Sequence, residues 1–147
     1  MIYISHRGNI NGKDEKKENT KEYILNALSY GYDVEVDVWY KDDRWFLGHD
    51  EPIHEIQINF LKQKKLWCHA KNFSSLRLMI KNDIHCFWHE EDKVTLTSQN
   101  YLWAFPGMQP MEGSIAVMPE INDEDVSKCI GICSDYIERY KIKKYEK

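Results

Sequence analysis

Side chains that could perform acid–base or metal chemistry follow the apolar runs of the first half of the chain. Four groups have this placement: His6-Arg7, Glu35 with Asp37, His49-Asp50, and His69 with Lys71. A strand that ends in such residues, instead of in turn residues, builds a site on a rigid sheet. In a barrel of parallel strands the carboxyl ends all meet at one rim. We therefore expect these side chains to converge at that rim.

Two carboxylates alternate with valines in residues 33–40. Glu35 and Asp37 are two residues apart, so both point to the same face of a strand. Buried carboxylates are costly unless a cation neutralises them. Their oxygen ligands suit Mg²⁺ or Ca²⁺. The alternative is the solvated face of an edge strand, but the neighbouring His6 and His49 favour a metal site.

Two histidines and two cations accompany these carboxylates. Imidazole titrates near neutral pH, so one of His6 and His49 can accept a proton while the other donates one. Arg7 offers a planar fork of donors that matches phosphate oxygens, and Lys71 adds a point charge. Salt bridges to the carboxylates are the alternative for both cations.

Four motifs occur in an order that is typical of one enzyme family. They are His6-Arg7-Gly8, Glu18-Asn19-Thr20, Glu35-x-Asp37 and His49-Asp50. In order and approximate spacing they resemble the signature of the glycerophosphodiester phosphodiesterases. The resemblance is strong over residues 2–50. Residues 66–71 and 131–136 resemble the third and the last barrel strands of that family more weakly.

The resemblance implies a metal-dependent phosphoric diester hydrolase in which His6 and His49 are acid and base. His49 is expected to protonate the leaving group. Arg7 and Lys71 would bind the phosphate, and the expected substrate is a glycerophosphodiester, either a small molecule or a group linked to a glycan or a lipid. Such a substrate would place the protein in lipid metabolism. Glu18 is counted with the metal site by resemblance, although capping of the following helix explains it nearly as well.

The chain departs from the family at Lys17, where a proline is usual, and at two places that concern the site. His69 stands where the family usually has a glutamate ligand. It could bind the metal through a ring nitrogen, which would favour Mn²⁺ or Zn²⁺ over Mg²⁺ or Ca²⁺, or it could only pack and hydrogen-bond. Residues 51–65 are also too few for the insertion that covers the glycerol site in the family. We therefore expect an open pocket that accepts a bulky diester.

Three further residues are weaker candidates for the pocket. His89 opens the polar cluster 89–92 after a strand, although a solvated turn explains that cluster better. Trp103 and Glu120 end later apolar runs. An aromatic side chain at the rim could line a glycerol or sugar pocket, while core packing explains Trp103 equally well.

The pattern of apolar residues predicts an α/β fold. Strands are expected at 2–5, 33–40, 66–70, 84–88, 93–97, 101–105, 114–118 and 131–134, with a hairpin partner at 44–48. Helices are expected at 20–30, 54–63, 73–81 and 123–130, followed by a charged tail at 138–147. This order predicts a reduced TIM-type (β/α) barrel in which several crossover helices of the second half are lost. Parallel neighbours normally need a dozen or more connecting residues, so antiparallel pairing within 93–118 is the main alternative.

Length and composition limit the class of protein. The 147 residues are expected to form one domain, residues 1–147, with a net charge of −4 that does not indicate nucleic-acid binding. No transmembrane segment or secretory leader is recognisable, and the four cysteines lack metal-binding spacing, so we expect reduced, buried thiols in a cytoplasmic protein. A shortened barrel exposes apolar strand surface, which would allow a homodimer.

Two other functions remain open at this point. A related phospholipase-type lyase would use the same histidines and stop at a cyclic phosphate, so product analysis would separate it from a hydrolase. A degenerate barrel that binds a phosphorylated ligand without turnover is the second alternative. Loss of helices and the change to His69 support that reading, whereas the intact histidines and carboxylates oppose it.

Overall fold

The structure, a computed structural model, describes residues 1–143, which contain ten strands and four α-helices. The strands are β1 (Ile2–His6), β2 (Asp33–Lys41), β3 (Arg44–Leu47), β4 (His54–Ile56), β5 (Leu66–Ala70), β6 (Cys86–Trp88), β7 (Val94–Leu96), β8 (Leu102–Ala104), β9 (Ser114–Val117) and β10 (Gly131–Ser134). The helices are α1 (Lys21–Ser29), α2 (Ile58–Leu61), α3 (Phe73–Lys81) and α4 (Ile137–Lys143), with a 3-10 turn, η1, at Pro119–Ile121.

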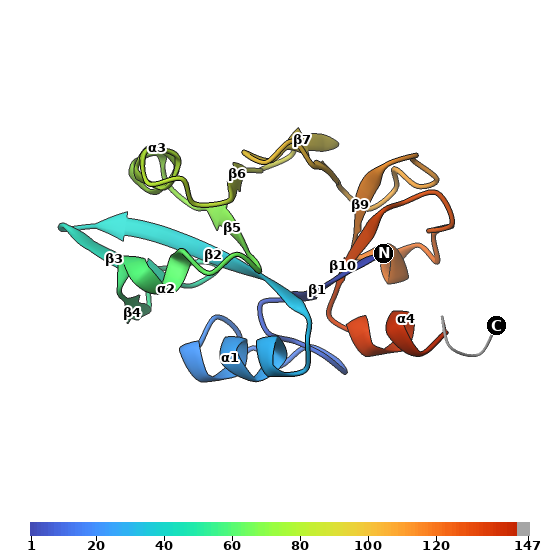
Figure 1. Ribbon diagram of the computed structural model, residues 1–147, viewed down its shortest axis with the longest axis horizontal. Coiled ribbons are helices and arrows are strands. Elements are labelled where there is room, and N and C mark those ends of the chain that lie inside the picture. The colour runs from blue at the N-terminus through green and yellow to red at the C-terminus, as the bar shows by residue number, and fades with distance from the viewer. Residues whose placement is uncertain (144–147) are drawn as a thin grey trace.

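All ten strands belong to one curled sheet. Parallel pairing links, in spatial order, β6, β5, β2, β1, β10, β9 and β8. The three remaining strands are antiparallel: β3 and β4 extend from β2, and β7 pairs with β8. Viewed along the strands, the sheet curves around a central space (Figure 1). The expected α/β class is confirmed, and the antiparallel alternative for residues 93–118 is correct for the β7–β8 pair.

The curl brings the two ends of the parallel array close together without a shared ladder. Within residues 1–143, β6 forms its ladder with β5 alone, and β7 pairs in the same way with β8 alone. Several hydrogen bonds that belong to no ladder connect the ends, and two of them show the pattern. The Ser98 amide donates to the Cys86 carbonyl at 2.8 Å, and the Thr95 hydroxyl donates to the Trp88 carbonyl at 2.9 Å.

The inner face of the curl is lined by every second residue of the parallel strands. Ile4, Trp67, Phe87, Trp103, Ile115 and Cys133 form one buried cluster there. Because side chains alternate across a strand, the residues two positions further along also face inward. This rule places the polar ends of β1, β2 and β5 above a packed apolar layer.

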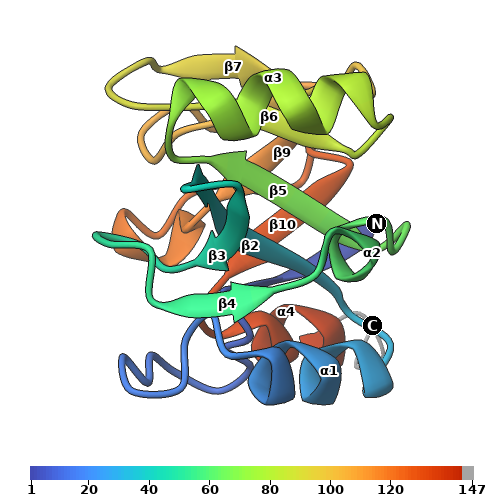
Figure 2. The same cartoon turned by 90° about the vertical axis from the view of Figure 1, so that its left-hand side faces the viewer.

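The outer face is covered by helices only in part. The valines of β2 pack against Ile24 and Ala27 of α1 and Met79 of α3. In Figure 2, α3 lies at the top of the molecule, and α1 and α4 lie at the bottom. Helix α1 begins after Thr20, whose hydroxyl accepts a hydrogen bond from the Tyr23 amide at 3.3 Å. Asn72 caps α3 in the same way, as its sequence position predicts.

Three sequence-based expectations are wrong. Residues 54–63 form the short strand β4 and one turn of helix, α2, because residues 54–56 pair with β3. The helix expected at 123–130 is absent, and these residues form turns that follow η1. Part of the expected charged tail is helix α4, because Ile137 is fully buried on the outer face of the sheet. The last four residues of that tail, 144–147, lie outside the described residues.

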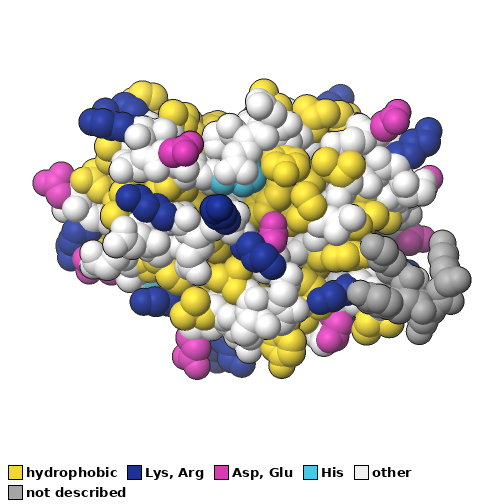
Figure 3. Space-filling view, viewed as in Figure 1, with side chains coloured by type: hydrophobic (Ala, Val, Ile, Leu, Met, Phe, Trp, Pro, Cys, Tyr) yellow, Lys and Arg dark blue, Asp and Glu magenta, His cyan; other side chains and the backbone are white. Residues whose placement is uncertain are grey.

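The face at the amino ends of the strands carries charged side chains of both signs. Figure 3 shows side chains of both charges around hydrophobic ones on this face.

The four cysteines, Cys68, Cys86, Cys129 and Cys133, are buried and form no disulfide, as expected. Within residues 1–143, no helix has the length and apolar character needed to cross a membrane.

Candidate active site

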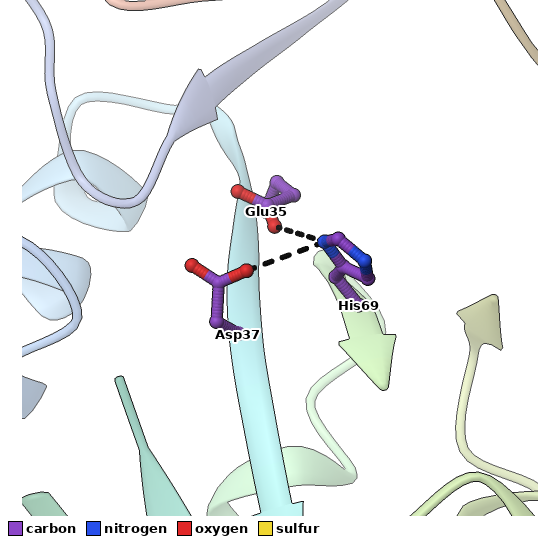
Figure 4. Close-up of side chains that lie close together, drawn as sticks. All are labelled: Glu35, Asp37 and His69. Carbon is purple, nitrogen blue, oxygen red and sulfur yellow. Dashed lines mark ion pairs between the residues drawn. The ribbon is translucent and has the colours of Figure 1, made fainter. Parts of the chain in front are cut away.

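Glu35, Asp37 and His69 meet on the inner face of the sheet (Figure 4). β2 and β5 pair in parallel with Asp37 directly opposite His69, so the three side chains come together from two neighbouring strands. The Nδ1 atom of His69 lies 3.3 Å from Asp37 Oδ1 and 3.8 Å from Glu35 Oε1. One ligand atom of each residue lies within 4.8 Å of those of the other two, which is close enough to share one metal ion.

The other ring nitrogen of His69 fixes the orientation of the ring. Nε2 lies 2.8 Å from the carbonyl oxygen of His89. A carbonyl can only accept, so Nε2 carries a proton and donates it. Nδ1 then faces the two carboxylates either as a bare lone pair or as the second N–H of an imidazolium. A backbone carbonyl on the outer nitrogen is the usual support of a metal-bound histidine.

The two carboxylates are almost completely removed from solvent. Glu35 is 2% exposed and Asp37 is fully buried. Glu35 Oε2 and Asp37 Oδ1 have no hydrogen-bond donor among the described residues. Burial and the charge of Asp37 raise the pKa of Glu35 to about 7. Burial alone would also raise the pKa of Asp37, but the His69 ring, whose Nδ1 atom lies 3.3 Å from Oδ1, and the Arg7 charge hold it below its usual value.

Asn19 and Arg7 hold Asp37 in place. The Asn19 amide donates to Asp37 Oδ2 at 2.9 Å, and its oxygen accepts from the Asp37 amide at 3.0 Å. Arg7 Nε lies 3.0 Å from the same Oδ2 atom. Both residues have left-handed backbone conformations, with φ of 60° for Asn19 and 57° for Arg7. Such conformations are uncommon outside glycine and tend to occur at functional sites.

Glu18 supports the site without joining the group of metal ligands. Its Oε2 atom lies 3.3 Å from Arg7 Nη1, and its Oε1 atom accepts from Asn9 Nδ2 at 2.9 Å. Both carboxylate oxygens are therefore engaged, away from the Glu35–Asp37–His69 group. Glu18 is better described as the partner of Arg7 than as the metal ligand that the resemblance implies.

His6 is oriented by an aspartate from the far end of the chain. Its Nδ1 atom lies 2.7 Å from Asp135 Oδ1, and its Nε2 atom lies 3.7 Å from Glu35 Oε2. Burial acts to lower the pKa of His6. The Asp135 hydrogen bond and the Glu35 charge outweigh that effect and raise the pKa above its usual value.

His49 approaches from the loop after β3 and is more open. Its side chain is 45% exposed, against 16% for His6, and its Nδ1 atom lies 2.8 Å from Asp50 Oδ1. Burial and the Arg7 charge lower its pKa. Gly48 permits this loop, because a Cβ atom there would lie 1.9 Å from the Glu51 carbonyl oxygen.

One cavity of about 350 Å³ collects most of the expected site residues at the carboxyl ends of the strands. Its polar side is lined by His6, Arg7, Glu35, His49, His69, Lys71, His89 and Glu90. Lys71 forms no ion pair with any residue in 1–143, whereas Arg7 is paired with Asp37 and Glu18. The salt-bridge alternative therefore describes Arg7 and not Lys71.

Of the three weaker candidates for the pocket, the structure places two in the cavity lining and one outside it. His89 and Trp103 line the cavity, and the His89 side chain is only 8% exposed, so it is not the solvated turn residue that its sequence suggests. Glu120 is absent from the cavity lining. Its carboxylate accepts hydrogen bonds from the hydroxyls of Ser134 and Tyr140 instead. Glu120 therefore belongs to the packing of α4.

Two residues of the site were missed in the sequence. Asp135 orients His6, and Asn9 donates to both Glu18 and Asp135, at 2.9 and 2.8 Å. A signal for Asp135 was present, because it continues the alternation of Gly131 and Cys133 on the inward face of the last strand. No comparable pattern marks Asn9, which lies in an irregular loop.

The raised pKa of Glu35 predicts how metal-free protein responds to pH. Between the usual value and about 7, the folded state keeps a proton that the unfolded state has lost. Stability therefore falls as pH rises through this window. Because other groups titrate nearby, the measurement is the difference in melting temperature between wild type and Glu35→Gln, from pH 5 to 8. We expect wild type to lose stability relative to the variant as pH rises. A constant difference would contradict the burial of an ionising Glu35.

Comparisons with known proteins give no match: no family model matches the sequence, and neither the curated proteins nor the solved structures contain a match. The resemblance to glycerophosphodiester phosphodiesterases therefore stays a prediction that depends on the four motifs.

Proposed function

We propose that this protein is a metal-dependent phosphodiesterase that acts on glycerophosphodiesters or related diesters. The observation that carries the proposal is the meeting of two buried carboxylates with His69 Nδ1 beneath a cavity that also presents His6, His49, Arg7 and Lys71. Acid–base groups, phosphate-binding cations and a candidate metal site thus occupy one place. The proposed fold class is the reduced TIM-type barrel, with β3 and β4 added beside β2.

The chemistry of the donors fits a divalent cation. Glu35 and Asp37 would each hold it through a carboxylate oxygen, and His69 would add Nδ1. When bound, such an ion stabilises negative charge on a phosphate oxygen and lowers the pKa of a bound nucleophile. The carboxylates favour Mg²⁺ or Ca²⁺, and the imidazole extends the choice to Mn²⁺ and Zn²⁺.

The remaining residues have roles that follow from their positions. Lys71 has no ion-pair partner within residues 1–143 and can approach a phosphate oxygen directly. Arg7 is held by Asp37 and Glu18 and lines the cavity as a fixed cation. Such pre-positioned charges stabilise charge that grows on the phosphate without needing to reorganise. His6 and His49 exchange protons with the nucleophile and the leaving group, and Asp135 and Asp50 orient their rings.

The histidine at position 69 predicts the choice of metal. His69→Glu restores the carboxylate that the resembling family has at this position. An additional oxygen ligand favours hard cations, whereas imidazole favours Mn²⁺ and Zn²⁺. We expect the variant to shift activity toward Mg²⁺ and Ca²⁺ by about tenfold or more relative to Mn²⁺. The measurement is kcat/KM with each ion after metal removal. An unchanged order of metals would show that His69 only packs against the site.

Products decide between the two enzymatic readings. A hydrolase releases a phosphate monoester, whereas a lyase that uses the neighbouring hydroxyl of the substrate stops at a cyclic phosphate. Phosphorus NMR of the reaction with a glycerophosphodiester distinguishes these two products. We expect the monoester. Accumulation of the cyclic product would assign the lyase reaction to the same site.

A further inference from the structure

The His89 side chain lines the cavity but has no role in the proposed reaction. It follows β6, and its Nδ1 atom lies 2.7 Å from Asp92 Oδ2. The carboxylate accepts from Nδ1, so in the neutral ring Nε2 is an acceptor. Nε2 is buried and has no hydrogen-bond partner among the described residues. A buried polar atom without a partner is destabilising and requires an explanation.

The surroundings of His89 differ from the catalytic side of the cavity. Its ring lies 5.1 Å from the ring of Phe105 and 6.0 Å from the ring of His69, measured between centroids. The neighbouring wall is apolar and consists of Trp103, Phe105, Pro106, Val117, Met118 and Ile121. A charged phosphate oxygen would be poorly placed there. An uncharged hydroxyl on a carbon skeleton fits both the apolar wall and the buried His89 Nε2 acceptor.

Two hydrogen bonds to main-chain carbonyls keep this side of the cavity in place. The His89 carbonyl accepts from His69 Nε2 at 2.8 Å, and the Phe105 amide donates to the Lys93 carbonyl at 2.9 Å. The loop that carries His89 is therefore attached to the candidate metal ligand through its main chain. A substituent on a phosphate bound beside His69 would be within reach of the His89 ring.

We propose that His89, oriented by Asp92, accepts a hydrogen bond from a free hydroxyl on the alcohol part of the phosphodiester. This inference rests on the proposed function, because it takes the phosphate to lie at the Glu35–Asp37–His69 site. It names the substrate class as esters of a polyol or sugar, whose carbon face packs on Phe105. A site that is built to bind a substrate hydroxyl discriminates strongly against the analogue without it.

The test is a binding measurement, so it does not require turnover. sn-Glycerol 3-phosphate and propyl phosphate differ by two hydroxyls on the same three-carbon skeleton. Calorimetric titration in the presence of Mg²⁺ or Mn²⁺ gives the affinity of wild type, His89→Phe and Asp92→Ala for each. His54→Phe is the matched control, because His54 lies on β4 and does not line this cavity. Asp92 is 46% exposed, so its replacement keeps the fold if His89→Phe does not.

Wild type and His54→Phe are expected to bind glycerol phosphate about tenfold or more tightly than propyl phosphate. In His89→Phe that preference should fall to within about twofold, through loss of affinity for glycerol phosphate alone, and Asp92→Ala should reduce it. The inference would be overturned if wild type showed no preference for glycerol phosphate, or if both variants kept the wild-type preference. It would also be overturned if neither ester bound. A His89-dependent preference in a protein that cleaves no diester would contradict the proposed function and leave this inference standing.

Discussion

Replacement of His6 or of His49 by alanine should lower turnover of an unactivated phosphodiester by roughly 10²–10⁴-fold, the usual scale for loss of a general acid or base. Both rings line the cavity, and each is held by a carboxylate, Asp135 for His6 and Asp50 for His49. Neither side chain is part of the apolar core. Circular dichroism and thermal melting should therefore show folded variants, which is the control for this experiment.

Substrates with different leaving groups separate the roles of the two histidines. A diester with a good leaving group, such as 4-nitrophenol, needs little help from a general acid. The variant that has lost the acid should therefore recover much more of its rate with this substrate than the variant that has lost the base. By family resemblance we expect the rescued variant to be His49→Ala.

The charges around the two rings make this experiment decisive. Without a bound cation, the pKa of His6 is raised and the pKa of His49 is lowered, so His6 gains its proton first as pH falls. A cation beside Glu35 would oppose the proton on His6. If the activated substrate restores the rate of His6→Ala instead, His6 is the acid and His49 is the base. Equal recovery of both variants, or near wild-type rates in both, would contradict acid–base catalysis by this pair.

The second large effect concerns the carboxylates. Asp37→Asn should lower kcat/KM by about 10²-fold or more, because charge stabilisation by a metal is worth several kcal/mol and each 1.4 kcal/mol is a factor of ten. The amide can keep the hydrogen bond with Asn19 while losing the charge. Calorimetric titration with Mn²⁺ should show weaker binding in parallel. Asp33→Asn is a matched control, since Asp33 lies on the same strand but accepts from Trp67 Nε1 at 2.9 Å.

Full activity of Asp37→Asn would show that the pair of carboxylates holds no catalytic metal. In that case Arg7 and a protonated His69 would neutralise Glu35 and Asp37, at the distances that the structure shows. The binding-module reading would then be the better account. The control variant should bind Mn²⁺ and turn over substrate as wild type does.

Much of this site could be predicted from strand periodicity. Alternation with valines placed Glu35 and Asp37 on one face, and parallel strands brought His6 and His69 to the same rim. These are local rules, and each of them depends on the sequence within a few residues. The expected convergence around one cavity follows from them, and the lining of that cavity includes His6, His49 and Lys71.

The parts that the sequence did not reveal depend on contacts between distant segments. Asp135 meets His6 across 129 positions, and Asn9 connects Asp135 to Glu18. Glu120 ends an apolar run, but the packing of α4 determines its partners. In residues 123–130 the pattern favoured a helix, yet the chain there forms turns that follow η1. Local propensity is a weak guide where tertiary contacts decide the backbone.

The most direct test of the account is the recovery of activity after metal removal. Wild-type protein is stripped with a chelator, dialysed, and assayed against a panel of glycerophosphodiesters with Mg²⁺, Ca²⁺, Mn²⁺ or Zn²⁺ added back, beside Asp37→Asn treated in the same way. We expect the stripped wild type to be inactive, at least one ion to restore hydrolysis, and Asp37→Asn to stay inactive with every ion. Metal-dependent hydrolysis would be contradicted if the stripped protein hydrolysed diesters as fast as the untreated protein. It would also be contradicted if no diester were hydrolysed with any ion.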